Sequence, residues 1–224
     1  EGAVRARSGA TMHNAGRALA ARLAGIDQAG DRGEAVVGVT SDHGEAMWEH
    51  GRLGHNDHVY DEMLAVPLVL HYPAGLGPTP GVRDALVSTL DIAPSILAWL
   101  DLPGFAEVDG VPLPSLFDEP DPERALLLRS FHDDPTLGLR SARTKVLSEP
   151  ARAGVKAKHQ AFDVLADPTE RQDLRLKDPK AYEALFAELQ RRYDSLLTAP
   201  DPSTPAGAPS AAEAELIQKL GYAE

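Results

Sequence analysis

Histidine and carboxylate side chains gather in one short stretch of this sequence. Four of the eight histidines fall between residues 43 and 58, where even spacing would put fewer than one: His43, His50, His55 and His58. From residue 31 to residue 62 there are eight carboxylates and only two arginines. Imidazole and carboxylate groups bind divalent cations, and both also transfer protons. The stretch is therefore a candidate metal or acid–base site, although a solvated acidic loop explains its composition equally well.

This stretch follows a segment with the pattern of a buried strand. Residues 36–40 are apolar, β-branched and bounded by polar turns, which is typical of a strand in a parallel sheet. A helix is expected before it, over residues 11–26, with Gly25 at its end. Open α/β sheets bind ligands beyond the carboxyl ends of their strands. The residues after Thr40 therefore stand where a site is expected.

The pattern of predicted strands and helices changes near residue 122. Up to about residue 122 we expect a second strand parallel to the first over residues 66–72, a short strand over 86–88 and a helix over 93–100. After residue 124, short alternating segments predict a small antiparallel sheet with strands near residues 125–128, 137–140, 144–147 and 160–164. An amphipathic helix over 179–197 would pack on it, followed by a Pro-rich linker (199–209) and a terminal helix (211–220).

Composition excludes several classes of protein. The net charge of −12 argues against nucleic acid as a partner, because such binding needs a basic face. No apolar run reaches the roughly 18 residues of a membrane span, and the first residues do not resemble a secretion signal. With no cysteine, the chain has no disulfide, thiolate ligand or cysteine nucleophile, and its compartment stays open.

The order of residues after Thr40 resembles the metal-binding turn of the sulfatase branch of the alkaline-phosphatase superfamily. That turn reads Thr40-Ser41-Asp42-His43-Gly44-Glu45. Further segments follow the same family in order and spacing: Glu49-His50-Gly51, Gly54-His55-Asn56, Tyr60-Asp61-Glu62, residues 66–70, residues 90–97, residues 139–147, and Phe162-Asp163-Val164 with residues 167–174. Together they cover nearly the whole chain, and the sequence is identified as a member of this family.

The resemblance implies roles for three residues. Asp42 and His43 match two ligands of one divalent cation, which in sulfatases is usually calcium. The imidazole of His43, however, is a ligand that favours manganese or zinc over calcium. His55 matches a position that contacts the sulfate, so it is expected to bind substrate and to act catalytically, as a donor to an ester oxygen or to the leaving group. His50 and His58 are expected to be surface or supporting histidines, and Asp57 could orient one of these rings.

The resemblance also implies a fold and a partner. The expected class is α/β: the C-terminal part of an alkaline-phosphatase-like parallel sheet sandwich plus a small α+β subdomain. Residues 1–117 would be the C-terminal half of the catalytic domain, 118–198 the small subdomain, and 199–224 the linker and terminal helix. The family's formylglycine nucleophile motif lies before the Asp-His turn, in an N-terminal half that we expect to be a missing partner. This chain alone is expected to be inactive.

Residues 148–152, Ser-Glu-Pro-Ala-Arg, fit the family's nucleophile pattern literally. They come after the metal turn rather than before it, and so short a pattern arises readily by chance. We therefore expect Ser148 to be part of a strand-ending turn and not a nucleophile.

Three functions remain open on the sequence. The leading hypothesis is the metal-binding part of a hydrolase of sulfuric esters, acting on an anionic sulfate ester. A phosphoric or phosphonic ester hydrolase, or a phosphotransferase, of the same superfamily would share the Asp-His turn. A truncated, non-catalytic metal-binding module is the third. An acidic protein repels any of these anionic esters unless a bound cation inverts the local field.

Overall fold

A computed structural model describes residues 2–30, 33, 35–55, 58–73, 75, 77, 79–104, 108–113, 121–130, 135–151 and 156–198. The expected linker and terminal helix after residue 198 lie outside the described residues, as does Asp57. Residues 1–189 form one compact unit and residues 190–224 a second, and each is considered on its own. In the part of the chain that is described, no helix is both long and apolar enough to cross a membrane.

The first helix is longer than the sequence predicts. Helix α1 spans Gly2–Ala29 and continues through Gly25, which was expected to end it. Gly30 follows with a φ of 78° and donates its N–H to the Asp27 carbonyl 3.2 Å away. A glycine in the left-handed region commonly ends a helix, because it has no Cβ to clash. The stop signal was therefore correct in kind but assigned to the wrong glycine.

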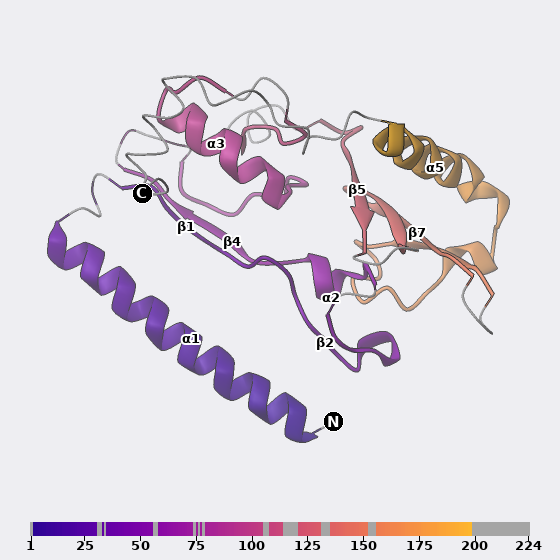
Figure 1. The fold of residues 1–224 in the computed structure, drawn as a ribbon, viewed down its shortest axis with the longest axis horizontal. Helices are drawn as coiled ribbons and strands as arrows, with labels where there is room; N and C mark the ends of the chain where they lie inside the picture. Colours follow the sequence, from indigo (N-terminus) through magenta and orange to yellow (C-terminus); the bar gives the residue numbers. More distant parts are fainter. Residues whose placement is uncertain are drawn as a thin grey trace. The chain divides into compact units, whose positions relative to one another are not determined.

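The two strands predicted near the site do lie in one sheet, side by side in Figure 1, but the parallel arrangement was wrong. Strand β1 (Val37–Thr40) pairs with β4 (Leu68–His71) in antiparallel register, with Val39 opposite Val69. Parallel neighbours need a crossover of a dozen or more residues, usually helical. Here the described connection contains only a small hairpin, a 3₁₀ turn and a four-residue helix, so the chain simply turns back.

That connection carries the candidate site residues. It consists of β2 (Ala46–Met47), the 3₁₀ turn η2 (Glu49–Gly51), β3 (Leu53–Gly54) and helix α2 (Asp61–Leu64). β2 and β3 form a two-residue hairpin ladder in which Ala46 faces Gly54 and Met47 faces Leu53.

The predicted strand over residues 86–88 is absent: this described segment joins no ladder. Instead, Val87 packs in an apolar cluster around Trp99 and Leu113, and Ser88 caps the next turn. The Ser88 hydroxyl accepts from the Leu90 N–H, while the Asp91 carboxylate accepts from the Ser88 N–H. This capping box starts the 3₁₀ turn η3 (Thr89–Asp91) and helix α3 (Ile92–Trp99), so the predicted helix is confirmed.

The small antiparallel sheet is confirmed as predicted. Its four strands run in sequence order: β5 (Ala125–Arg129), β6 (Leu137–Ser141), β7 (Thr144–Glu149) and β8 (Lys158–Asp163). Val146 and Phe162 are fully buried in it. The 3₁₀ turns η4 (Leu174–Leu176) and η5 (Lys180–Tyr182) lead into helix α5 (Glu183–Thr198), which matches the predicted amphipathic helix.

Candidate functional site

The three residues predicted to form the site come together just beyond the end of β1. The Asp42 Oδ2 and His43 Nε2 atoms are 3.7 Å apart. The His43 and His55 rings stack with centroids 4.3 Å apart. Their side chains are open to solvent, with exposed fractions of 86% for Asp42, 45% for His43 and 42% for His55.

Local hydrogen bonds shape the turn that carries Asp42. Its Oδ1 accepts from the His43 N–H at 3.0 Å and from the Ser41 hydroxyl at 3.3 Å. These bonds, the His43 N–H first, hold the pKa of the Asp42 carboxyl below its usual range. The carboxylate is therefore ionised at neutral pH, as a cation ligand must be.

The His43 ring is oriented with one nitrogen free for a ligand. Nδ1 lies 2.7 Å from the Gly44 carbonyl oxygen, which can only accept a hydrogen bond. Nδ1 must therefore carry the proton in the neutral ring, which leaves the lone pair on Nε2, the atom that faces Asp42. A backbone carbonyl that fixes the tautomer in this way is common behind metal-binding histidines.

These two donors fit a divalent cation only in part. A separation of 3.7 Å lets one ion contact both atoms at ligand distances of roughly 2.0–2.5 Å. Within the described residues, no group of three or more His, Cys, Asp or Glu side chains is arranged to hold a metal. The donor chemistry of Asp42 and His43 suits a cation, and a cation held there would take two of its ligands from these described residues.

A second carboxylate, which was given no role from the sequence, lies beside His55. Glu45 Oε1 is 3.8 Å from His55 Nδ1, and the Glu45 side chain is half exposed. The β2–β3 hairpin explains this proximity, because its register places Gly54 opposite Ala46 and so brings the next residues on each side together. The sequence signal for this contact was the short return loop between two apolar pairs, which is typical of a hairpin.

The other two histidines are packed against neighbouring residues and are not exposed on the surface. His50 is half-buried, with Nδ1 2.9 Å from Glu62 Oε1 and Nε2 3.0 Å from the Glu170 carbonyl oxygen. Its ring stacks on Tyr60, with centroids 3.8 Å apart. His58 is only 3% exposed. Neither ring is directed toward solvent as an open ligand would be.

Residues of the small sheet contact the loop that carries the histidines, at Arg52 and at Tyr60. The Tyr60 hydroxyl donates to Gln160 Oε1 at 2.5 Å, and burial raises the pKa of this phenol, so it remains a donor. Arg52 pairs with Glu149 at 2.8 Å. These contacts could not be foreseen from the sequence, because they join residues about a hundred positions apart.

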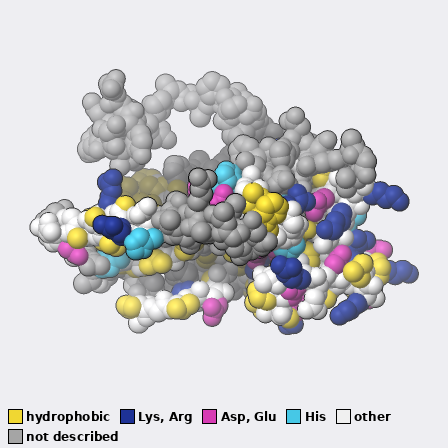
Figure 2. All heavy atoms as spheres, turned by 90° about the horizontal axis from the view of Figure 1, so that it is seen from below, with side chains coloured by type: hydrophobic (Ala, Val, Ile, Leu, Met, Phe, Trp, Pro, Cys, Tyr) yellow, Lys and Arg dark blue, Asp and Glu magenta, His cyan; other side chains and the backbone are white. Residues whose placement is uncertain are grey.

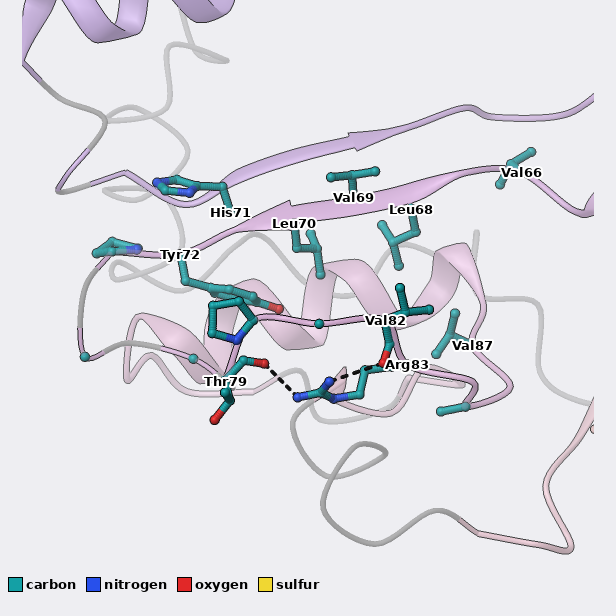
Figure 3. Close-up of a pocket in the computed structure, with 16 residues that line it drawn as sticks. Val66, Leu68, Val69, Leu70, His71, Tyr72, Thr79, Val82, Arg83 and Val87 are labelled. Atoms are coloured by element: carbon teal, nitrogen blue, oxygen red, sulfur yellow. Dashed lines mark hydrogen bonds between the residues drawn. The ribbon is translucent and has the colours of Figure 1, made fainter.

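A hollow of about 780 Å³ lies elsewhere, between β4 and the loop that follows it (Figure 3). Among the described residues that line it, most are apolar, including Leu68, Leu70 and Val87, and none is a predicted site residue. Arg83 donates to the Thr79 carbonyl at 2.7 Å across its rim. The chemistry expected from the sequence is therefore not located in this hollow.

The acidic excess of the chain is not a uniform coat. On the face shown in Figure 2, Lys and Arg side chains lie among Asp and Glu side chains. Among the described residues, Arg143 and Asp163 form an ion pair at 2.7 Å, with the Arg143 side chain exposed.

Comparisons with known proteins agree on one family. The sequence model described as "Sulfatase" matches residues 3–102. An ulvan-active sulfatase of Formosa agariphila is 31% identical over 188 residues, covering 80% of this chain and 36% of that protein. The chain therefore spans about a third of the length of the curated relatives it matches.

Solved structures share the fold. A protein in complex with its substrate D-glucosamine-2-N,6-O-disulfate matches with a TM-score of 0.59 and 19% identity, over 79% of this chain and 37% of that one. A phosphonate monoester hydrolase of Agrobacterium radiobacter matches with a TM-score of 0.61 and 23% identity, over 80% of this chain and 38% of that one. The alkaline-phosphatase-like class expected from the sequence is confirmed. The matches to the sequence model and to the curated relatives show that the chain belongs to the sulfatase family.

Proposed function

We propose that the protein carrying this chain hydrolyses sulfuric esters, and that residues 42–55 supply part of its site for one divalent cation. The observation that carries the proposal is the convergence of Asp42, His43 and His55 beyond β1, in a chain of the sulfatase family. A relative named as a sulfatase and a neighbour bound to a disulfated sugar support a sulfated substrate.

Asp42 and His43 would hold the cation, through Oδ2 and Nε2. When bound, the cation supplies Lewis-acid polarisation of the ester oxygens and neutralises their charge. Family usage supports calcium, whereas an imidazole ligand supports manganese or zinc. The ionised Asp42 carboxylate supplies the negative charge that attracts any of the three.

His55 would meet the substrate rather than the cation. Its ring stacks on His43 and its side chain is partly open to solvent, so a proton on one nitrogen can reach an ester oxygen. A donor in this position holds a non-bridging oxygen or protonates the leaving group. Glu45 Oε1 lies 3.8 Å from Nδ1 of the same ring.

A second candidate is hydrolysis of phosphonic or phosphoric monoesters. It is supported by the fold shared with a phosphonate monoester hydrolase. The Asp-His turn serves either ester class, because both substrates present anionic oxygens to a cation. A non-catalytic metal-binding module stays the third alternative for this chain.

The proposal is tested by calorimetric titration of this chain with Ca²⁺, Mn²⁺ and Zn²⁺. We expect weak binding, because the described residues fill only two ligand positions. Asp42→Ala should abolish the binding, while Asp84→Ala, at an exposed position on another loop, should leave it unchanged. Equal binding by the Asp42→Ala variant would overturn the metal site.

The ester class is tested on the complete protein that carries the chain. Hydrolysis of 4-nitrophenyl sulfate should exceed that of 4-nitrophenyl phenylphosphonate, and Asp42→Ala should remove it. The reverse preference would favour the second candidate. Metal binding without hydrolysis of either ester would favour the non-catalytic module.

A further inference from the structure

The turn that carries Asp42 and His43 rests directly on helix α2. The Gly44 N–H donates to the Met63 carbonyl oxygen at 2.7 Å. A Cβ on Gly44 would lie 2.0 Å from the Glu62 carbonyl oxygen, so the two backbones are in contact. Any shift of α2 must therefore move the turn.

Helix α2 is in turn fixed by a buried lysine of the small sheet. Lys145, on β7, has no exposed side-chain surface, and its Nζ donates to Asp61 Oδ1 at 2.6 Å. The same Nζ lies 2.7 Å from Glu170 Oε1, and the Glu170 side chain is 1% exposed. The other Glu170 oxygen accepts from the Asp61 N–H at 2.6 Å. We call Lys145, Asp61 and Glu170 the lysine cluster.

Burial makes the geometry of the lysine cluster exacting. An ammonium removed from water recovers its lost hydration only if its counter-charges are well placed and hydrogen-bonded. Here one carboxylate belongs to the first residue of α2 and the other lies in the turn after β8, more than a hundred residues away in sequence. The cluster therefore ties α2 to the small sheet at one defined position.

His50 adds a second connection between the same parts. It bridges Glu62 on α2 and the backbone of Glu170, at 2.9 and 3.0 Å. His50 contacts Glu62 itself, and the lysine cluster holds Asp61, the residue before it; Gly44 contacts Glu62 and Met63 on the same helix.

We propose that the lysine cluster positions the Asp42–His43 turn, so that the small antiparallel sheet sets the geometry of the candidate cation site. Lys145, Asp61 and Glu170 are positioning residues, because they act on the turn through α2. The functional meaning of the turn rests on the proposed function, but the mechanical coupling to Gly44 does not require a metal.

The experiment measures amide hydrogen exchange in the full chain, at two amides. The Gly44 N–H reports the contact between the turn and α2, and the Val164 N–H, bonded to the Arg143 carbonyl at 2.9 Å, reports the small sheet. Lys145→Met and Glu170→Gln should accelerate exchange at Gly44 by about tenfold or more relative to Val164, because only local opening is affected. Lys145→Arg, which keeps the charge, should restore much of the protection.

Arg143→Met is the matched control. It removes the cation of an exposed ion pair with Asp163 of the same small sheet, 2.7 Å long. It should not accelerate exchange at Gly44 relative to Val164. The affinity for Mn²⁺ should be measured on the same variants. It should decrease in Lys145→Met and Glu170→Gln, the two variants in which the Gly44 amide loses protection, and in no other.

The outcomes separate the two proposals. Exchange that rises equally at Gly44 and Val164, or stays unchanged at Gly44 in folded Glu170→Gln, overturns the positioning role even if Mn²⁺ binds. A selective rise at Gly44 supports it even if the unmodified chain binds no Mn²⁺, which would instead overturn the proposed metal site.

Discussion

The imidazole rings of His43 and His55 stack with their centroids 4.3 Å apart and an angle of 27° between their planes. The residues come from opposite sides of the β2–β3 hairpin, whose ladder returns the chain toward β1. A ligand candidate and a proton-donor candidate thus lie side by side, although twelve positions separate them in the sequence. This pairing allows a cation and an ester oxygen to be held at neighbouring points.

Replacing His55 by alanine should lower kcat of the complete protein by about 10²–10⁴ if the ring acts as a general acid. Binding of Mn²⁺ should persist, since His55 is expected to touch substrate and not the cation. Steady-state kinetics and metal titration of the same variant test both statements. His13→Ala, at an exposed position on α1, is the control and should change neither kcat nor Mn²⁺ binding. A His55→Ala variant with full activity would remove the substrate role.

Replacing Ser148 by alanine should change turnover little. Ser148 lies within β7, paired with Leu137 on one side and His159 on the other, and is not on the loop that carries Asp42. The strand-ending turn predicted at Ser148 was wrong, because β7 continues to Glu149, and Ser148 belongs to the small sheet. Loss of a hundredfold in kcat, roughly 3 kcal/mol of barrier, would show that Ser148 is a nucleophile after all.

The sequence indicated which residues lie together in the candidate site, but it did not indicate the buried contacts that hold them in place. The Asp-His turn and His55 carry recognisable chemistry in a fixed order, so their proximity could be anticipated. The contacts behind them could not be anticipated, because the sequence around Lys145 is that of an ordinary polar position in a strand. Its burial against Asp61 depends on how two distant segments pack, and local periodicity holds no information on that.

The fold shows the same division between local and distant information. Helices α3 and α5 and the four-stranded sheet follow short-range patterns and were predicted. Strand direction was not, because an apolar run such as Val37–Thr40 looks alike in parallel and antiparallel pairs. The deciding feature was the absence of a long helix from the described connection between β1 and β4. The segment over residues 86–88 was predicted to be a short strand, yet its last residue, Ser88, caps the turn that follows.

Replacing Gly44 by alanine should destabilise the chain by about 1–3 kcal/mol, the usual cost of forcing an extra carbon into a packed site. The new Cβ would lie 2.0 Å from the Glu62 carbonyl oxygen, and a backbone group cannot rotate away as a long side chain can. Denaturant unfolding measures the loss. Gly25→Ala is the control, because it lies inside α1 with open space around it and should be neutral or stabilising. Equal effects of the two substitutions would contradict the contact.

The Asp163 carboxylate should make the small sheet sensitive to acid. Its Oδ2 accepts from Arg143 Nε at 2.9 Å, and its Oδ1 accepts from the Leu165 and Ala166 N–H groups. These bonds, that from Arg143 first, hold the pKa of Asp163 below its usual range. The folded state therefore binds the proton less tightly than the unfolded chain, whose value is about 3.9.

The sign of the pH effect follows from this depressed pKa. The stabilisation by Asp163 is complete above the unfolded pKa and is lost as pH falls through the lower pKa of the folded state. Asp163→Asn should therefore be less stable than the unmodified chain at neutral pH, and the difference should shrink only below about pH 4. Denaturant unfolding of both proteins from pH 7 downward measures that difference. Arg143→Met should reduce it in part, because the Leu165 and Ala166 N–H groups remain. A difference that stays constant with pH would show that Asp163 stabilises the sheet by packing rather than by its charge.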